Sequence, residues 1–138
     1  MIKEVKPPEA WQMLRHEPQA VLLDVRSRVE FAYVGHPPGA INVPWKEPPD
    51  WVIDDNFVDK VRSALTGLYP QAGRVEDLII LSLCRSGQRS RTAGEALQAR
   101  GFNCVYNIAE GFEGDRDQYQ HRNTINGWRV HQLPWEQS

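Results

Sequence analysis

The chain has 138 residues, of which 41% are hydrophobic and 25% are charged. This length and composition are typical of one folded globular domain and argue against a disordered chain. The net charge of −2 gives no reason to expect nucleic acid or an anionic membrane as a partner. The first fourteen residues lack an apolar signal core, and two cysteines are too few for a disulfide framework. We therefore expect a single domain over residues 1–138, in the reducing cytoplasm.

Short strands and helices alternate through the first third of the chain. The unbroken apolar run Val21–Leu23 is typical of a strand that helices cover on both faces. Ser27 and Glu30 form a capping-box pattern at the start of a short helix. The predicted elements are strands at 2–5, 21–23 and 40–43, and helices at 8–15 and 29–33.

Residues 44–76 are the least regular part of the chain and form a predicted insertion. They hold four of the ten prolines and two of the five tryptophans, Trp45 and Trp51. Apolar residues between 57 and 65 recur at helical spacing, so we expect one amphipathic helix there, ended by Gly67. No strand is predicted within the insertion.

The second half of the chain continues the alternation. Leu78–Leu83 is the most apolar run, which predicts a central strand that ends directly before Cys84. A helix at 90–100, a strand at 105–108 and an extended tail at 115–138 follow, the tail carrying Trp128 and Trp135. Alternating strands and helices predict an α/β fold with a mainly parallel sheet.

The segment after the central strand carries the candidate chemistry. In an open α/β sheet, ligands bind where the ends of strands meet the starts of helices, and Cys84 lies at such a junction. Gly87 lets the loop curl, and free backbone N–H groups at a helix start bind anions. Residues 78–94 contain Arg85, Arg89 and Arg91 but no acid, so this stretch is locally basic. A thiolate in such a loop suits nucleophilic attack on an anionic substrate. In the alternative interpretation, Cys84 is a buried, inert cysteine and the arginines belong to a solvated helix start. This interpretation does not explain why the strand, the cysteine, the basic glycine-bearing loop and the helix start occur together.

Four segments resemble the rhodanese family of sulfurtransferases, specifically its single-domain type. They are Leu22–Arg26, Gly35–Pro44, Cys84–Ser90 and the Gly101-Phe102 pair leading into Val105–Asn107. The resemblance implies a central five-stranded, mainly parallel sheet with helices on both faces. It also implies that Cys84 becomes a persulfide, and that the loop residues Arg85, Ser86, Gly87, Gln88 and Arg89 bind the substrate through their backbone amides. The insertion and the tail depart from the minimal family pattern.

The resemblance further implies a two-step transfer of sulfur. The Cys84 thiolate takes the sulfane sulfur of thiosulfate or a related donor, and a small thiol, cyanide or a protein thiol then accepts it. The reaction needs no metal and no organic cofactor. His16, His121 and His131 also lack the spacing of metal ligands.

Two other functions remain open at this point. Cysteine phosphatases and arsenate reductases resemble this loop, but they place five residues between cysteine and arginine. Here four residues separate Cys84 from Arg89, and Ser90 occupies the position of the phosphatase arginine. A non-catalytic interaction module of the same fold is the second alternative, and it would carry no covalent sulfur on Cys84.

The remaining candidates are interpreted as structural. We expect Asp24 and Arg26 to order a strand end, His36 to support a turn, and Cys104 to be an inert core residue. For the tryptophans outside the motifs there are two hypotheses. They could roof the Cys84 pocket, but we favour the interpretation that they fill a peripheral core.

Overall fold

The computed structural model describes residues 2–138 and contains a five-stranded sheet in which every pair of neighbouring strands is parallel. The strand order is β1-β7-β6-β2-β3, so β6 lies in the middle, as the sequence predicts. The five strands are β1 (Lys3–Val5), β7 (Cys104–Ile108), β6 (Ile79–Leu83), β2 (Ala20–Asp24) and β3 (Ile41–Asn42). The predicted five-stranded α/β architecture is confirmed.

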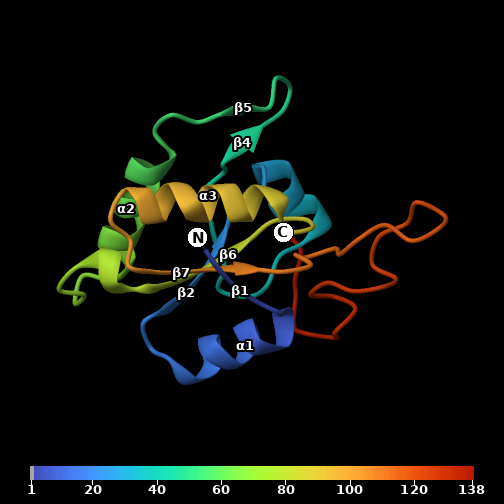
Figure 1. Ribbon diagram of the computed structural model, residues 1–138, viewed down its shortest axis with the longest axis horizontal. Coiled ribbons are helices and arrows are strands. Elements are labelled where there is room, and N and C mark those ends of the chain that lie inside the picture. Colours follow the sequence, from blue (N-terminus) through green and yellow to red (C-terminus); the bar gives the residue numbers. More distant parts are fainter. Residues whose placement is uncertain (1) are drawn as a thin grey trace.

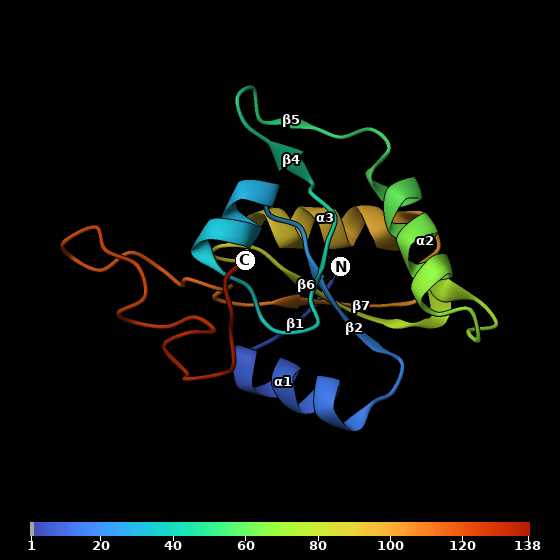
Figure 2. The same cartoon turned by 180° about the vertical axis from the view of Figure 1, so that it is seen from behind.

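Helices cover both faces of this sheet (Figures 1 and 2). The helices α2 (Phe57–Leu68) and α3 (Gln88–Ala99) lie on one face, and α1 (Pro7–His16) lies on the other. Side chains of β6 alternate between the two cores: Ile80 packs on the α2–α3 side, whereas Leu81 and Leu83 pack on the α1 side. Cys84, directly after the strand, belongs to the α2–α3 side. No helix within residues 2–138 is both long and apolar enough to cross a membrane.

Two helix boundaries differ from the prediction. α3 begins at Gln88, two residues before the expected start, because Gly87 adopts a left-handed φ of 107° and turns the chain directly into the helix. α2 continues through Gly67 to Leu68, and the N–H of Tyr69 bonds to the carbonyl of Leu65. A glycine inside the last turn weakens a helix but does not end it when the apolar face is already packed.

The insertion contains a short hairpin that the sequence analysis missed. β4 (Lys46–Glu47) pairs antiparallel with β5 (Val52–Ile53), beyond the α3 side of the sheet in both views (Figures 1 and 2). Strands of two residues are too short to show the alternation that identifies a strand. The expected helix at 29–33 is a single helical turn followed by a π-helical segment, Glu30–Val34.

The C-terminal tail contributes to the core without forming a regular element. Trp128 is fully buried and meets Trp11 of α1 edge-to-face, with ring centroids 6.0 Å apart. Its indole N–H donates to the carbonyl of Pro134. Farther along, Glu136 pairs with His36 through two backbone hydrogen bonds. The favoured interpretation, a tryptophan filling a peripheral core, is confirmed for Trp128.

Candidate active site

Cys84 lies between the end of β6 and the start of α3, at the bottom of a tightly curled loop. The left-handed backbone of Gly87 turns its amide back, so that the Gly87 N–H donates to Cys84 Sγ across 3.1 Å. Cys84 is buried, with 1% of the residue exposed. A backbone donor aimed at a buried sulfur stabilises negative charge on that sulfur.

A second polar group reaches the sulfur from the first turn of α3. The Ser90 hydroxyl lies 3.2 Å from Cys84 Sγ and 2.5 Å from Oδ1 of Asn107 on β7. Neither Ser90 nor Asn107 was among the predicted site residues. The helix start at Gln88 places Ser90 within the first turn of α3, so that its side chain faces Cys84. The position of Asn107 depends on which strand lies beside β6, and the local sequence carries no signal of this.

The two arginines of the loop differ in their partners. Both Nη atoms of Arg89 donate to the carboxylate of Glu30, at 2.8 and 2.9 Å. Burial alone would raise the pKa of Glu30, but the hydrogen bonds and charge of Arg89, with the Ser27 contacts, lower it to about 2. Arg85 has no carboxylate within ion-pair distance among residues 2–138. The Arg85 guanidinium is therefore the loop's unpaired cation.

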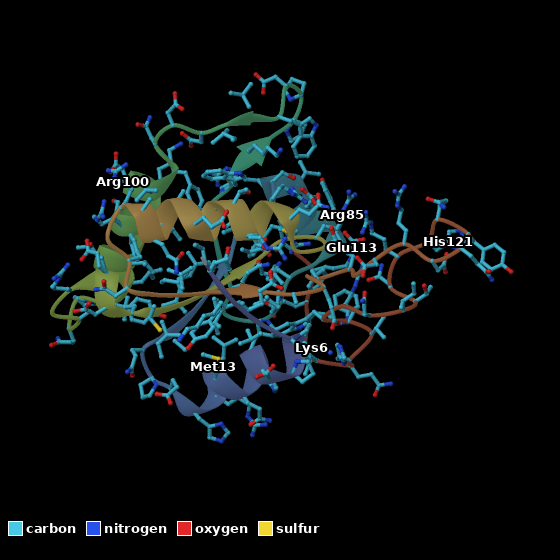
Figure 3. All side chains as sticks on the ribbon, viewed as in Figure 1. Lys6, Met13, Arg85, Arg100, Glu113 and His121 are labelled. Atoms are coloured by element: carbon cyan, nitrogen blue, oxygen red, sulfur yellow. The ribbon has the colours of Figure 1, made fainter. Side chains whose placement is uncertain are left out.

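The loop residues are divided between two hollows. A cavity of about 600 Å³ opens beside the loop, lined by Glu30, Val34, Lys46, Trp51, Arg85, Arg89 and Glu113. Ser86 and Gln88 instead line a polar hollow of about 360 Å³, formed with the tail. Figure 3 shows Arg85 and Glu113 close together near the start of α3, at the base of the projecting tail segment that carries His121.

The insertion forms one wall of the larger cavity. Trp51, in the turn of the β4–β5 hairpin, is 45% exposed, and its ring centroid lies 5.8 Å from the Arg89 guanidinium carbon. The hypothesis of a roof over the pocket thus agrees with the position of Trp51 but not with that of the buried Trp128. Cys84 itself is not part of this lining.

The turn after β7 holds the backbone of the Cys84 loop. The carbonyl of Cys84 accepts from the N–H of Phe112, and the carbonyl of Arg85 accepts from the N–H of Glu113, both at 2.9 Å. Gly111 passes so close that a Cβ there would lie 2.5 Å from the carbonyl of Arg85. The loop conformation is therefore fixed from outside as well as by Gly87.

The other candidates occupy structural positions. Asp24 and Arg26 form a fully buried ion pair of 2.6 Å, and Arg26 also donates to the carbonyl of Gly35. His36 is buried, stacks on Phe31 and contacts that residue's carbonyl through Nδ1. Cys104 is a half-buried free cysteine at the start of β7. None of these side chains hydrogen-bonds to Cys84 in the part of the chain that the structure describes.

The sequence matches the family model of the rhodanese-like domain over residues 6–118. The chain belongs to this family. A protein of Rickettsia conorii is 31% identical over 140 residues, covering 98% of each chain. The thiosulfate sulfurtransferase GlpE of Haemophilus influenzae is 28% identical over 112 residues, covering 81% of this chain and 86% of its own.

Solved structures show the same fold for this rhodanese-like domain. The crystal structure of Rv0390 from M. tuberculosis superposes with a TM-score of 0.81 at 34% identity, covering 99% of this chain and 98% of that one. The similarity to Rv0390 extends over nearly the whole chain, so the insertion and the tail belong to the matched region.

Proposed function

We propose that this protein is a sulfurtransferase that carries sulfane sulfur as a persulfide on Cys84. The observation behind this proposal is that the Gly87 amide at the start of α3 donates to Cys84 Sγ, in a loop whose Arg85 guanidinium is unpaired and lines the neighbouring cavity. An amide donor favours a thiolate, and the arginine attracts an anionic sulfur donor. The similarity to GlpE, named a thiosulfate sulfurtransferase, supports the same activity.

The reaction proceeds in two displacements. The Cys84 thiolate attacks the outer sulfur of thiosulfate, a bond forms between the two sulfurs, and the S–S bond of thiosulfate breaks. Sulfite leaves with the electron pair of that bond, and Cys84 becomes a persulfide. Cyanide or a thiolate, including that of a protein, then attacks the outer persulfide sulfur. Thiocyanate or a new persulfide leaves, and the Cys84 thiolate is restored.

The loop would bind the donor with its backbone amides, from Arg85 through Ser86, Gly87 and Gln88 to Arg89. Of the loop's own side chains in residues 2–138, Arg85 offers the unpaired positive charge, because the Arg89 guanidinium already binds Glu30; Lys46 adds a second cation to the cavity lining. The reaction requires a free thiolate, which a reducing compartment such as the cytoplasm preserves.

Intact-protein mass spectrometry before and after incubation with thiosulfate tests this function. We expect the wild-type protein to gain one sulfur atom and to lose it again when cyanide is added. Cys84→Ser should gain none, whereas the matched control Cys104→Ser should behave like wild type. If neither thiosulfate, mercaptopyruvate nor a small persulfide loads sulfur onto Cys84, the proposal is wrong, and a binding module or an oxyanion-directed enzyme would have to be considered.

A further inference from the structure

Two acceptors compete for the proton of the Ser90 hydroxyl. Ser90 Oγ lies 2.5 Å from Oδ1 of Asn107 and 3.2 Å from Sγ of Cys84. All three side chains are buried, which limits access of water as a substitute donor. A serine hydroxyl carries one proton, so it makes one strong hydrogen bond as a donor at a time. Ser90 therefore donates either to the amide oxygen or to the sulfur.

The other contacts of Asn107 determine which way its amide points. Its Nδ2 lies 3.1 Å from the carbonyl of Gly87 and 3.3 Å from Oε2 of Glu4. A hydrogen bond from Arg91 lowers the pKa of Glu4, so this carboxylate only accepts, as the carbonyl does. The amide nitrogen must face these oxygens, which leaves Oδ1 facing Ser90. Because Oδ1 has no proton, the short contact is a hydrogen bond that Ser90 donates.

This arrangement affects the two protonation states of Cys84 differently. While the Ser90 hydroxyl proton is hydrogen-bonded to Oδ1 of Asn107, Ser90 presents only lone pairs to the sulfur. A thiol can donate its S–H to them, whereas a thiolate cannot. The thiolate then keeps the Gly87 N–H, and it gains the Ser90 proton only by breaking the bond between Ser90 and Asn107.

We propose that Asn107 is a positioning residue that draws the Ser90 proton away from Cys84 and thereby keeps the attacking sulfur weakly hydrogen-bonded. The inference rests on the proposed function, since a thiolate loses nucleophilicity as it is stabilised. In the persulfide, Sγ of Cys84 carries no charge and needs no second donor. The Ser90 hydroxyl therefore keeps its hydrogen bond to Asn107 at that stage.

Several charged groups surround this cluster. Arg85 and Arg89 lie in the loop, and Asp24 at the end of β2 and Glu4 on β1 approach from the sheet, paired with Arg26 and Arg91. All of them are retained in the variants below. Asn107→Leu also removes the Nδ2 contacts with the Gly87 carbonyl and Glu4, so only the part of its effect that disappears together with Ser90 reports on the hydroxyl and its acceptor.

The test measures the rate of iodoacetamide alkylation of Cys84 against pH, in a Cys104→Ser background. We expect Asn107→Leu to free the Ser90 proton for the sulfur, which lowers the midpoint of the profile by about one pH unit. The rate at the high-pH plateau should fall about threefold, because the better-stabilised thiolate is less nucleophilic. Ser90→Ala in the Asn107→Leu background should reverse both effects.

Two further variants separate this competition from a loss of packing. Ser90→Ala alone should shift the midpoint of the alkylation profile by less than about 0.3 pH unit, since in the wild type the Ser90 hydroxyl donates to Asn107 and not to the sulfur. Ser82→Ala, which removes a buried hydroxyl bonded to the Ser90 carbonyl at 3.0 Å, should leave the profile unchanged.

The inference is overturned if the effect of Asn107→Leu persists without Ser90, because it is then a packing effect. A rise of about one unit in Ser90→Ala alone would also overturn it, since Ser90 would already donate to the thiolate. This second outcome can be read even if Asn107→Leu fails to fold. Alkylation needs no sulfur donor, so failure here is distinct from failure of sulfur loading in the mass measurement.

Discussion

Glu30 neutralises one of the two arginines in the Cys84 loop. Its carboxylate binds Arg89 through two hydrogen bonds and also accepts from the Ser27 hydroxyl at 2.9 Å. Both partners of the ion pair are largely buried, with side-chain exposures of 15% and 17%. At the scale of the residue, the pair therefore connects the loop to the segment after β2, and it leaves anion attraction in the cavity to Arg85 and Lys46.

The Glu30–Arg89 pair makes stability depend on acidic pH. The folded-state pKa of Glu30, about 2, lies below its ordinary value of 4.5. Its contribution, at most about 3 kcal/mol, is therefore complete above pH 4.5 and is lost as pH falls toward 2. Urea unfolding of wild type and Glu30→Gln across this range should show a difference at pH 6 that shrinks at pH 3. An equal difference at both pH values would contradict this prediction. As a control, Asp59→Asn breaks an exposed ion pair with Arg100 and should change the free energy of unfolding little at either pH.

At the scale of the element, the β4–β5 hairpin forms one wall of the cavity beside the loop. Trp51 lies close to Arg89 but is nearly half exposed, so its removal takes little from the core. Trp51→Ala should keep the free energy of unfolding within about 0.5 kcal/mol of the wild type. It should slow sulfur loading about two- to fivefold, because the loss of an exposed cation–π contact corresponds to a factor of that size. Ile53→Ala, on the same hairpin but outside the cavity lining, should change neither. Normal loading with a lowered melting temperature would instead indicate a packing role for Trp51.

The turn after β7 supports the Cys84 loop by close backbone approach. Gly111 and Gly39 both have left-handed φ values, 72° and 80°, but a Cβ at Gly111 would meet the Arg85 backbone, whereas one at Gly39 would meet nothing within 4 Å. Both Gly→Ala variants carry backbone strain of about 1 kcal/mol. Only Gly111→Ala should also displace the loop and slow sulfur loading. Thermal unfolding measures the stability of both variants, and mass spectrometry measures their rate of sulfur loading. Equal effects of the two substitutions would show that the contact does not matter.

At the scale of the whole molecule, the C-terminal tail completes the core on the α1 face. Trp128 joins the tail to α1 through its contact with Trp11. It also joins the tail to the turn after β7, because the backbone N–H of Trp128 donates to the carbonyl of Gly111 at 2.8 Å. The tail thus stabilises the turn that holds the Cys84 loop. This connection explains how a segment remote from Cys84 in sequence bears on the candidate site.

Trp128→Ala should lower the free energy of unfolding by about 3–5 kcal/mol, since it removes a fully buried indole. Trp135→Ala is the matched comparison, because Trp135 is 43% exposed and makes outer contacts, edge-to-face with Phe112, beneath the Arg129 guanidinium and beside Gly35. Its loss should be markedly smaller. Urea unfolding measures both, and similar losses would mean that the tail is held by its outer contacts rather than by Trp128.

Features encoded within short stretches were predictable from the sequence. The apolar runs became β2 and β6. The curled loop follows from the order of features around Cys84, which are a strand, the cysteine, a glycine and a helix start. Each depends on neighbours in the chain: burial of consecutive apolar residues, and a glycine that turns the backbone into a helix. The two-residue strands β4 and β5 escaped prediction because such short pairs show no periodicity.

The sequence by itself determined the α/β fold, the family resemblance and the position of Cys84 at the junction of strand and helix. Only the tertiary structure decided which residues surround the sulfur and the loop. Glu30 meets Arg89 across 59 positions of the chain, and Asn107 meets Ser90 across 17. Such contacts follow from the strand order, in which β7 and β2 flank β6, and from the packing of side chains between layers. Local propensity does not specify that order, because it results from the burial of both sheet faces at once.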